Sequence, residues 1–375
     1  MEIFLIDPRN TTKPYNFCLL SSLREKKFPF KFFGFIPNFW KDKLLIKENN
    51  LFLPISRGIF ENKHLQLFIA NFTQTLEMFQ GYLRLKGLLK EDTILHFLWF
   101  TSPGIEHYII PHLKRVKMIH TVHNLLPHRD YPRDLYLFKA LYSQMDEIIV
   151  HDKKTEKNFY KIFDLSLPIT VIPHGNVERF YETFDSTTAS ESEEFYFKKI
   201  GLLKRPIFLF MGPIKKYKGF ENLIGSLNIL NRKKLSYSVV VKDWIKEKME
   251  NLYSLNVSLH YSKLGLVYRN VDAVILPHTK ISQSITLFEA GYFGKPVIVS
   301  NSGGLEEVVR DGKDGFVFNG SKYEDLADKI EKLIQAGPKE LKVMGENFKE
   351  HLIKNYSWDK ISEKLIKIYE RILNC

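Results

Sequence analysis

Cysteine is scarce in this sequence, with two residues in 375, Cys18 and Cys375. So few cysteines exclude a disulfide framework and are typical of a reducing compartment. No apolar run approaches the roughly 20 residues that cross a bilayer, so we expect no transmembrane helix. Residues 1–7 contain two acids and no basic segment, so we expect no signal peptide. These absences predict a cytoplasmic protein.

The common motifs of metal-dependent and hydrolytic sites are also missing. The sequence has no Asp-x-Asp pair to hold a nucleotide through magnesium, and no nucleophile elbow of the Ser/His/Asp hydrolases. His120 and His123 lie on or just after an expected strand, where their side chains diverge, and no cysteine is nearby. We therefore expect neither a metal nor a cofactor, and lysines and helix ends would have to bind any phosphate.

Positive charge is in excess, with a formal net charge of +12. The excess is spread over both halves without a basic arm or block, which argues against a nucleic-acid partner. Diffuse positive charge suits phosphate-bearing substrates or an anionic membrane, although lysine-rich solvated faces explain it equally well. Residues 23–33 and 82–90 mix cations with aromatic or apolar residues. These stretches suit an anionic interface, or core residues flanked by solvated lysines.

Expected strands and helices alternate along the whole chain, which predicts parallel sheets built from βα units. A second alternating half begins at 207–211 and includes an expected helix at 244–253 and a strand at 257–259. The fold class is therefore α/β, with two Rossmann-like domains facing a cleft. Ligands in such sheets bind beyond the carboxyl ends of the strands. The expected strands of the first half are 3–6, 31–36, 93–97, 117–122, 147–150 and 169–172.

Domain boundaries follow from the same alternation. We expect an N-terminal domain at 1–183, a linker at 184–203 and a C-terminal domain at 204–356, because residues 183–194 are polar and rich in Ser and Thr. Apolar residues at helical spacing predict a last amphipathic helix over 357–375.

Two glycine-bearing loops flank a short apolar strand at 296–300. Such turns present backbone N–H groups and the positive end of a helix, which suit phosphate. Ser282 and Glu289 are close to two helical turns apart and share one helix face. A carboxylate there can accept hydrogen bonds from a ribose diol, which indicates a nucleotide site. An ordinary strand–turn–helix unit with a surface acid explains the same pattern.

Four motifs here resemble the donor-binding signature of glycosyltransferase family 4. They are LFEA at 287–290, GKPVI at 294–298, Gly303-Gly304 with Glu307, and a Gly-x-x-Gly turn at 312–315. The resemblance covers nearly the whole chain. It implies the GT-B architecture, with the last helix crossing back to the N-terminal domain. It also implies transfer of a hexose from a GDP- or UDP-sugar, with Glu289 on the ribose.

The run His-Asn-Leu-Leu-Pro-His at 123–128 resembles a subgroup of bacterial polysaccharide glycosyltransferases, as does the segment 10–20. This resemblance implies a glycan or lipid-linked acceptor in cell-surface polysaccharide synthesis. It also implies a peripheral position on the inner face of the membrane.

The turn at 212–219 follows the first strand of the second half, and its lysines can reach a diphosphate as point charges. Family 4 enzymes typically have a lysine at the position of Lys218 and an arginine at that of Pro213. The resemblance therefore implies that Lys218 stabilises the leaving diphosphate, with Lys215 replacing the arginine. A solvated basic turn is the alternative.

Polar residues follow three expected strand ends of the first half, which favours a site at that edge of the sheet. A lone histidine after a strand is more often structural. His123 is the expected sugar-facing catalytic histidine, acting as a base or positioning the donor. The other expected acceptor or cleft residues are Trp99, Asn124, His128 and His174.

One departure from the signature bears on function. The family has two acids eight residues apart, and the first position is Ile281, which cannot bind a sugar hydroxyl. Retaining or inverting stereochemistry therefore stays open, as does a nucleotide-sugar epimerase or hydrolase of this fold. A non-catalytic nucleotide-sugar-binding partner is a third possibility. The expected donor-binding residues are Gly212, Ser282, Gln283, Ser284, Gly303, Gly304 and Glu307.

Overall fold

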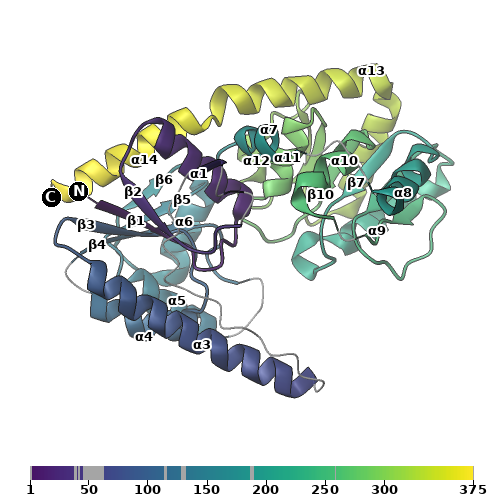
Figure 1. Ribbon diagram of the computed structural model, residues 1–375. Helices are drawn as coiled ribbons and strands as arrows, with labels where there is room; N and C mark the ends of the chain where they lie inside the picture. Colours follow the sequence, from purple (N-terminus) through teal and green to yellow (C-terminus); the bar gives the residue numbers. More distant parts are fainter. Residues whose placement is uncertain are drawn as a thin grey trace. The chain divides into compact units, whose positions relative to one another are not determined.

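The computed structural model describes residues 2–37, 40, 43–44, 63–113, 116–127, 132–185, 190–257 and 259–374, without the side chains of 63–74 and 191–192. The chain divides into two compact units (Figure 1). The first unit comprises Met1–Pro173 and Asp359–Cys375, and the second comprises His174–Trp358. Each unit contains one six-stranded sheet with parallel pairing throughout its described strands, so the two predicted Rossmann-like halves are confirmed.

The first sheet has the strand order β2-β1-β3-β4-β5-β6. The chain passes from β1 to β2 on one side and then to β3 on the other, so the order reverses between β1 and β3. Open α/β sheets bind ligands beyond the carboxyl ends of the strands at such a reversal. The strands are β1 (Glu2–Ile6), β2 (Phe30–Phe33), β3 (Thr93–Phe97), β4 (Lys117–Val122), β5 (Glu147–Val150) and β6 (Ile169–Val171).

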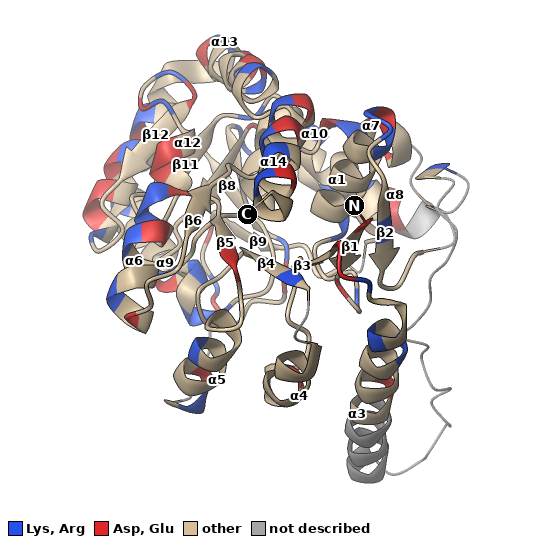
Figure 2. Ribbon diagram, turned by 90° about the vertical axis from the view of Figure 1, so that its left-hand side faces the viewer, with Lys and Arg blue, Asp and Glu red and all other residues tan. Residues whose placement is uncertain are grey.

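Helices cover both faces of the first sheet, with α1 and α14 on one face and α3, α4 and α5 on the other (Figure 1 and Figure 2). Lys and Arg are interspersed with Asp and Glu along α5 and α14 (Figure 2). The helices are α1 (Lys13–Glu25), α3 (Lys63–Leu88), α4 (Pro103–Ile109), the 3-10 helix η1 (Ile110–Leu113), α5 (Pro132–Tyr142), α6 (Lys153–Phe163) and α14 (Trp358–Leu373).

The second sheet has the strand order β12-β11-β10-β7-β8-β9. Counted from β7, this is the order 6-5-4-1-2-3 of dinucleotide-binding Rossmann sheets, and its reversal lies between β7 and β10. The strands are β7 (Ile207–Phe210), β8 (Ser238–Val241), β9 (Leu252–Ser254), β10 (Ala273–Leu276), β11 (Val297–Ser300) and β12 (Gly315–Phe318).

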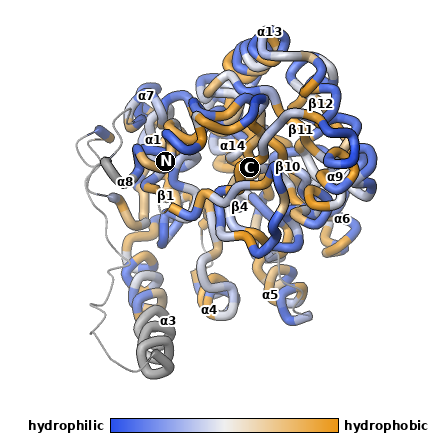
Figure 3. The backbone as a smooth tube through the Cα atoms, turned by 90° about the vertical axis from the view of Figure 1, so that its right-hand side faces the viewer, coloured by the Kyte–Doolittle hydropathy of each residue, from blue (hydrophilic) through white to orange (hydrophobic). Residues whose placement is uncertain are grey.

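The helices of the second unit include α13 (Tyr323–Asn355), which is kinked at Gly337. Its turns are mainly hydrophilic with apolar positions between them (Figure 3), as expected for a helix with one buried face. The others are α7 (Glu178–Phe184), α8 (Glu191–Gly201), η2 (Lys216–Lys218), α9 (Phe220–Arg232), η3 (Tyr261–Lys263), α10 (Leu264–Arg269), α11 (Ile285–Tyr292) and α12 (Leu305–Val308).

The cores lie where the strand pattern predicts. Parallel strands are buried on both faces and are therefore continuously apolar. In β1, Ile3 to Ile6 are fully buried, and so are Phe208 and Leu209 in β7. Within 23–33 of the first unit, Leu23 and Phe32 are also fully buried. This stretch therefore contributes to the core, which was one of its two interpretations.

The last helix belongs to the first unit, as the sequence predicted. Ser362 Oγ and Ser22 Oγ of α1 are 2.9 Å apart, and Tyr369 Oη lies 2.6 Å from His96 Nδ1 of β3. Arg371 forms an ion pair with the buried Glu147 of β5. Helix α1 and the strands β3 and β5 of the first unit therefore hold α14 in place.

The boundary between the units lies at Pro173/His174, before the predicted position near residue 183. Asn176 N donates to Tyr356 O at 2.8 Å, and Trp358 Nε1 donates to Asn176 O at 2.7 Å. These bonds tie the segment after β6 to the second unit. The predicted linker contains α8, which begins with a capping box formed by Ser190 and Glu193. Residues 186–189 lie outside the described part of the chain.

The predictions of a helix at 244–253 and a strand at 257–259 are wrong. Residues 244–249 form a loop, β9 lies at Leu252–Ser254, and Val257 and Leu259 are outside strands. Asp243 explains the difference, because its carboxylate accepts hydrogen bonds from Ile214 N at 2.7 Å and Trp244 N at 2.8 Å. Such side-chain bonds to the backbone compete with helix formation.

Candidate functional site

Two loops meet at the reversal of the second sheet, one after β7 and one after β10. Gly219 has φ of +71°, and a Cβ there would lie 1.7 Å from the carbonyl oxygen of Pro277. Thr279 N also donates to Tyr217 O at 2.8 Å. The lysine-bearing turn and the loop that leads into α11 are therefore packed backbone to backbone.

The turn after β11 joins the same assembly. Gly303 has φ of +58°, and a Cβ there would lie 1.6 Å from Ile281 O. Gly304 N donates to Ser282 O at 2.8 Å, and Gln283 Nε2 donates to Gly304 O at 3.4 Å. Ser282, Gln283, Gly303 and Gly304, all predicted donor-binding residues, therefore lie together at the carboxyl edge of the sheet.

A Gly303→Ala substitution tests this close packing. We expect it to lower the free energy of unfolding by about 2–3 kcal/mol, because the added methyl group displaces the loop at Ile281. Gly312→Ala is the matched control, because Gly312 has a similar φ of +73° but no neighbour within 4 Å of an added Cβ. It should cost only the left-handed strain, about 1 kcal/mol. Equal losses in denaturant titrations of the two variants would contradict the described packing.

Lys218 lies under the turn after β7, where its Nζ donates to Met211 O at 3.2 Å. A Cβ at Gly212 would lie 3.0 Å from this Nζ, so glycine leaves the space that the lysine occupies. Burial lowers the pKa of Lys218 to about 8, while the charge of Glu289 opposes the shift and Lys215 adds to it. A desolvated cation that is still mainly protonated at pH 7 is well suited to an incoming diphosphate.

Glu289 lies in α11 and is only 3% exposed. Its Oε1 accepts a hydrogen bond from Tyr181 Oη at 2.7 Å, and its Oε2 accepts one from Tyr268 Oη at 2.6 Å. Burial raises the pKa of Glu289, and the two tyrosine hydroxyls and Lys218 oppose this rise. The carboxylate predicted to hold a ribose is thus already clamped by two tyrosines, which the sequence analysis did not identify.

The remaining predicted donor residues differ in exposure. Ser284 is buried and precedes the first residue of α11, whereas Lys215 and Glu307 are exposed. Lys215 O accepts a hydrogen bond from Lys218 N at 2.8 Å, so the two lysines belong to one turn.

A cluster of aromatic and imidazole rings lies at the carboxyl edge of the first sheet. The ring of His123 lies 4.8 Å from that of Tyr15, 4.8 Å from that of His151 and 5.6 Å from that of Trp99. His123 Nδ1 and His151 Nε2 are 3.2 Å apart. The structure thus brings together the predicted His123 and Trp99 and adds Tyr15 and His151. His151 directly follows an expected strand, so the sequence contained its signal.

The remaining residues that follow or end these strands are placed as follows. His174 belongs to the second unit, where its ring stacks on Phe288 of α11 at 4.7 Å. Asn124 is half-buried beside His123, and His128 lies outside the described residues. His96 is structural, because its ring nitrogens lie 2.6 Å from Tyr369 Oη and 2.7 Å from Thr121 Oγ1.

The loop after β1 contains a buried polar network that the sequence analysis missed. Asp7 Oδ2 accepts hydrogen bonds from Thr11 N at 2.7 Å and Asn16 Nδ2 at 2.8 Å. Nearby in the first unit, Glu106 accepts bonds from Tyr82 Oη at 2.8 Å and Ser102 N at 2.9 Å. Burial raises the pKa of both carboxyls, that of Glu106 to about 7.

Glu106 should make stability depend on pH. Its folded-state pKa of about 7 lies above its ordinary value of 4.5, so its contribution is complete below pH 4.5 and is lost as the pH rises through 7. The free energy of unfolding should therefore fall by about 3 kcal/mol over this window. Urea titrations of the Glu106→Gln variant should not show this fall in the free energy of unfolding. Parallel pH profiles for the variant and the original protein would refute the assignment.

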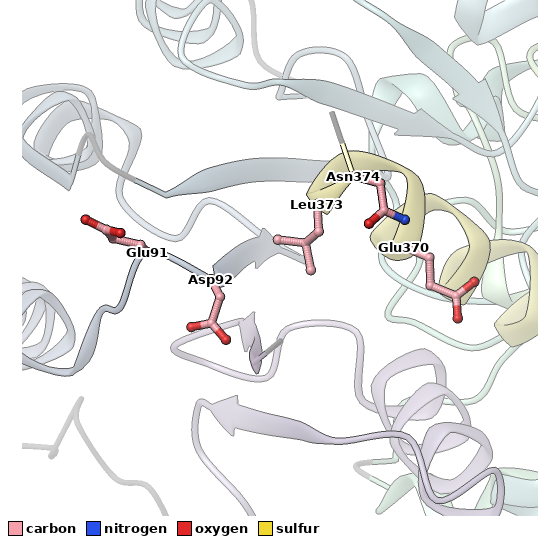
Figure 4. Close-up of a pocket in the computed structure, with 5 residues that line it drawn as sticks. All are labelled: Glu91, Asp92, Glu370, Leu373 and Asn374. Carbon is pink, nitrogen blue, oxygen red and sulfur yellow. The ribbon is translucent and has the colours of Figure 1, made fainter.

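A surface pocket in the first unit lies away from these loops. Glu91 and Asp92 precede β3, and Glu370, Leu373 and Asn374 end α14, so the pocket is at the amino edge of the sheet (Figure 4). Ligands of open α/β sheets bind at the opposite, carboxyl edge. The acidic side chains drawn in Figure 4 also disfavour a phosphate-bearing ligand.

No group of three or more His, Cys, Asp or Glu residues within the described ranges could hold a metal ion. None of the helices in the same ranges is both long enough and apolar enough to span a bilayer.

The chain is similar in sequence to known glycosyltransferases. Residues 192–351 match the family model "Glycosyl transferases group 1". An uncharacterized glycosyltransferase of Methanocaldococcus jannaschii is 23% identical over 78% of this chain and 79% of that protein. A Campylobacter jejuni enzyme, N,N'-diacetylbacillosaminyl-diphospho-undecaprenol alpha-1,3-N-acetylgalactosaminyltransferase, is 24% identical over 53% of this chain and 52% of that protein.

A solved structure extends the likeness to both units. Anabaena HepE, determined in complex with UDP-glucose, has a TM-score of 0.68 at 13% identity, with 99% of this chain and 100% of that chain covered. At this identity the match establishes the fold, which is the GT-B architecture that the sequence predicted. The chain therefore has the GT-B fold, and its residues 192–351 are similar to the glycosyl transferases group 1 model.

Proposed function

We propose that the protein is a hexosyltransferase. It moves a hexose from a GDP- or UDP-sugar to a glycan or lipid-linked acceptor in cell-surface polysaccharide synthesis. The observation that carries the proposal is the convergence of three loops at the reversal of the second sheet, with the desolvated Lys218 beneath them. Backbone N–H groups and a half-buried cation are the donors that a transferring diphosphate needs.

Each group has a distinct role in this proposal. Lys218, assisted by Lys215, neutralises the charge that develops on the leaving diphosphate, without a metal ion. Glu289 accepts hydrogen bonds from the ribose, and Ser282, Gln283 and Ser284 contact the phosphates or the hexose. His123 is the sugar-facing histidine. Gly303 and Gly304 let the backbone approach the donor closely.

The relatives support the donor and acceptor classes. HepE was determined with UDP-glucose, which supports a nucleotide-sugar donor. The Campylobacter relative is named for a diphospho-undecaprenol acceptor, which supports a lipid-linked acceptor here. In this chain, Leu76, Phe79 and Leu83 are exposed at helical spacing on α3, next to Arg84. An apolar stripe beside cations is compatible with peripheral binding to the inner face of the membrane.

Acceptor dependence tests the proposed reaction. Purified protein would be given UDP- and GDP-sugars, with and without membrane extracts that contain lipid-linked glycans, and release of nucleoside diphosphate would be measured. A transferase releases the nucleotide much faster with acceptor and yields a labelled lipid-linked product. Equal release without acceptor would indicate a hydrolase, and conversion of the sugar without nucleotide release an epimerase. Binding without turnover would indicate a non-catalytic partner.

A further inference from the structure

We infer that His151 is a positioning residue for His123. It holds the proton of the neutral His123 ring on Nδ1 and leaves the lone pair on Nε2. The role of that lone pair in the reaction rests on the proposed function, whereas the protonation pattern follows from the first unit alone.

Strand register explains why the two rings meet. Val122 of β4 pairs with Val150 of β5. The next residue on each strand, His123 and His151, therefore leaves the sheet beside the other. Their ring centroids are 4.8 Å apart, with His123 Nδ1 lying 3.2 Å from His151 Nε2.

The direction of the hydrogen bonds follows from a carbonyl at one end. Ile172 O lies 3.0 Å from His151 Nδ1, and a carbonyl oxygen can only accept, so His151 Nδ1 carries a proton. In a neutral ring the other nitrogen then carries the lone pair. His151 Nε2 must therefore accept from His123 Nδ1–H, which leaves the lone pair of a neutral His123 on Nε2.

Burial keeps His151 neutral, as this chain of bonds requires. His151 is 2% exposed, and desolvation lowers its pKa to about 4. The ring of Tyr15 packs against both imidazoles in T-shaped geometry, with centroids 4.8 Å from His123 and 5.6 Å from His151. These apolar contacts favour the uncharged ring, so His151 accepts rather than donates at Nε2 near neutral pH.

The tautomer determines what His123 can do. With the lone pair on Nε2, this atom can accept a hydrogen bond or a proton from a hydroxyl group of the donor sugar or the acceptor. With the opposite tautomer, the same atom could only donate. Groups behind a reactive histidine commonly set its tautomer in this way, and their loss typically costs 10- to 100-fold in activity or affinity at metal sites.

Nitrogen-15 NMR of the imidazole groups tests the inference directly. His123 would be assigned from the signals lost in His123→Gln, and its tautomer would be read near neutral pH. We expect Nδ1–H in the original protein and a shift toward Nε2–H in His151→Phe, which removes the acceptor. His151→Gln, whose amide oxygen can accept from His123, should restore Nδ1–H. Turnover should fall about 10- to 100-fold in His151→Phe and recover partly in His151→Gln.

His120→Phe is the matched control. His120 is also buried and lies on β4, next to β5, and its Nδ1 donates to Phe97 O at 2.8 Å. The substitution therefore removes a similar ring and a similar hydrogen bond. It should leave the His123 tautomer unchanged. An Nε2–H ring in the original protein, or an unchanged tautomer in His151→Phe, would overturn the inference.

Two further outcomes keep the proposals separable. If His151→Phe does not fold, the original protein and His151→Gln decide the matter, because Nε2–H in either would overturn the inference. If His123 has the expected tautomer but no nucleotide-sugar is consumed, the proposed function fails while the positioning role stands.

Discussion

Replacing Lys218 with methionine should lower turnover of a nucleotide-sugar about a thousandfold. Methionine retains the aliphatic length but removes the cation, and one donor to a developing oxyanion is worth about 10²–10³ in rate. A charge in a half-buried turn is screened less by solvent than one on the open surface, which adds to this effect. Initial rates at saturating donor, measured with the lipid-linked acceptor, would show the loss.

Lys215→Met is the matched control for this change. Lys215 belongs to the same turn but is exposed, so its charge is screened and the loss should be about tenfold or less. Similar losses in the two variants would contradict a special role for the half-buried Lys218.

The pH profile provides an independent check on Lys218. Its folded-state pKa of about 8 lies below the ordinary value of 10.5, so the cation is lost as the pH rises through 8. The value of kcat/KM for the donor should therefore decline above about pH 8. A profile that is flat to pH 10 would mean that the charge of Lys218 is not needed.

Replacing Glu289 with alanine should lower the free energy of unfolding by about 4 kcal/mol, as well as abolishing donor binding. The substitution leaves a cavity beside α11. It also removes the hydrogen-bond acceptor of two buried hydroxyls, those of Tyr181 and Tyr268. Each unsatisfied group costs about 1–3 kcal/mol, and the cavity adds to this. Denaturant titration measures the loss.

Glu289→Gln separates binding from stability. Glutamine keeps the volume and one acceptor oxygen, so we expect a loss of about 1–2 kcal/mol in stability. Donor affinity should still fall, because a neutral amide accepts hydrogen bonds from a ribose more weakly than a carboxylate. Glu307→Ala, which truncates an exposed acid of α12, should change stability by no more than about 0.5 kcal/mol. A Glu289→Ala protein as stable as the Glu307→Ala control would contradict the described clamp.

The sequence predicts the alternation of strands and helices well, because buried parallel strands are short, apolar and bounded by turns. It also predicts that Lys218 and the glycines of the candidate site lie in loops that follow strands. It fails where local side-chain bonds override helical spacing, as at Asp243, and where a capping box lies inside a Ser/Thr-rich stretch, as at Ser190. Composition alone does not distinguish such a helix start from a linker.

The partners of the site residues are less predictable. Tyr181 and Tyr268 come from α7 and α10, so no spacing relative to Glu289 in the sequence indicates that both meet its carboxylate. His151 is different, because it follows β5 as His123 follows β4, and adjacent parallel strands place such residues side by side. The contacts of Tyr181 and Tyr268 with Glu289 can be found only in the folded structure.

The most direct test of the donor site is thermal stabilisation by UDP, GDP, ADP and CMP and their sugars in the absence of metal. A ligand that binds only the folded state adds about 2.7 kcal/mol at a hundredfold excess over its dissociation constant. We predict stabilisation by one nucleoside diphosphate and its sugar, and its loss in Lys218→Met. No stabilisation by any of them, with or without the lipid-linked acceptor, would contradict a nucleotide-sugar site in this protein.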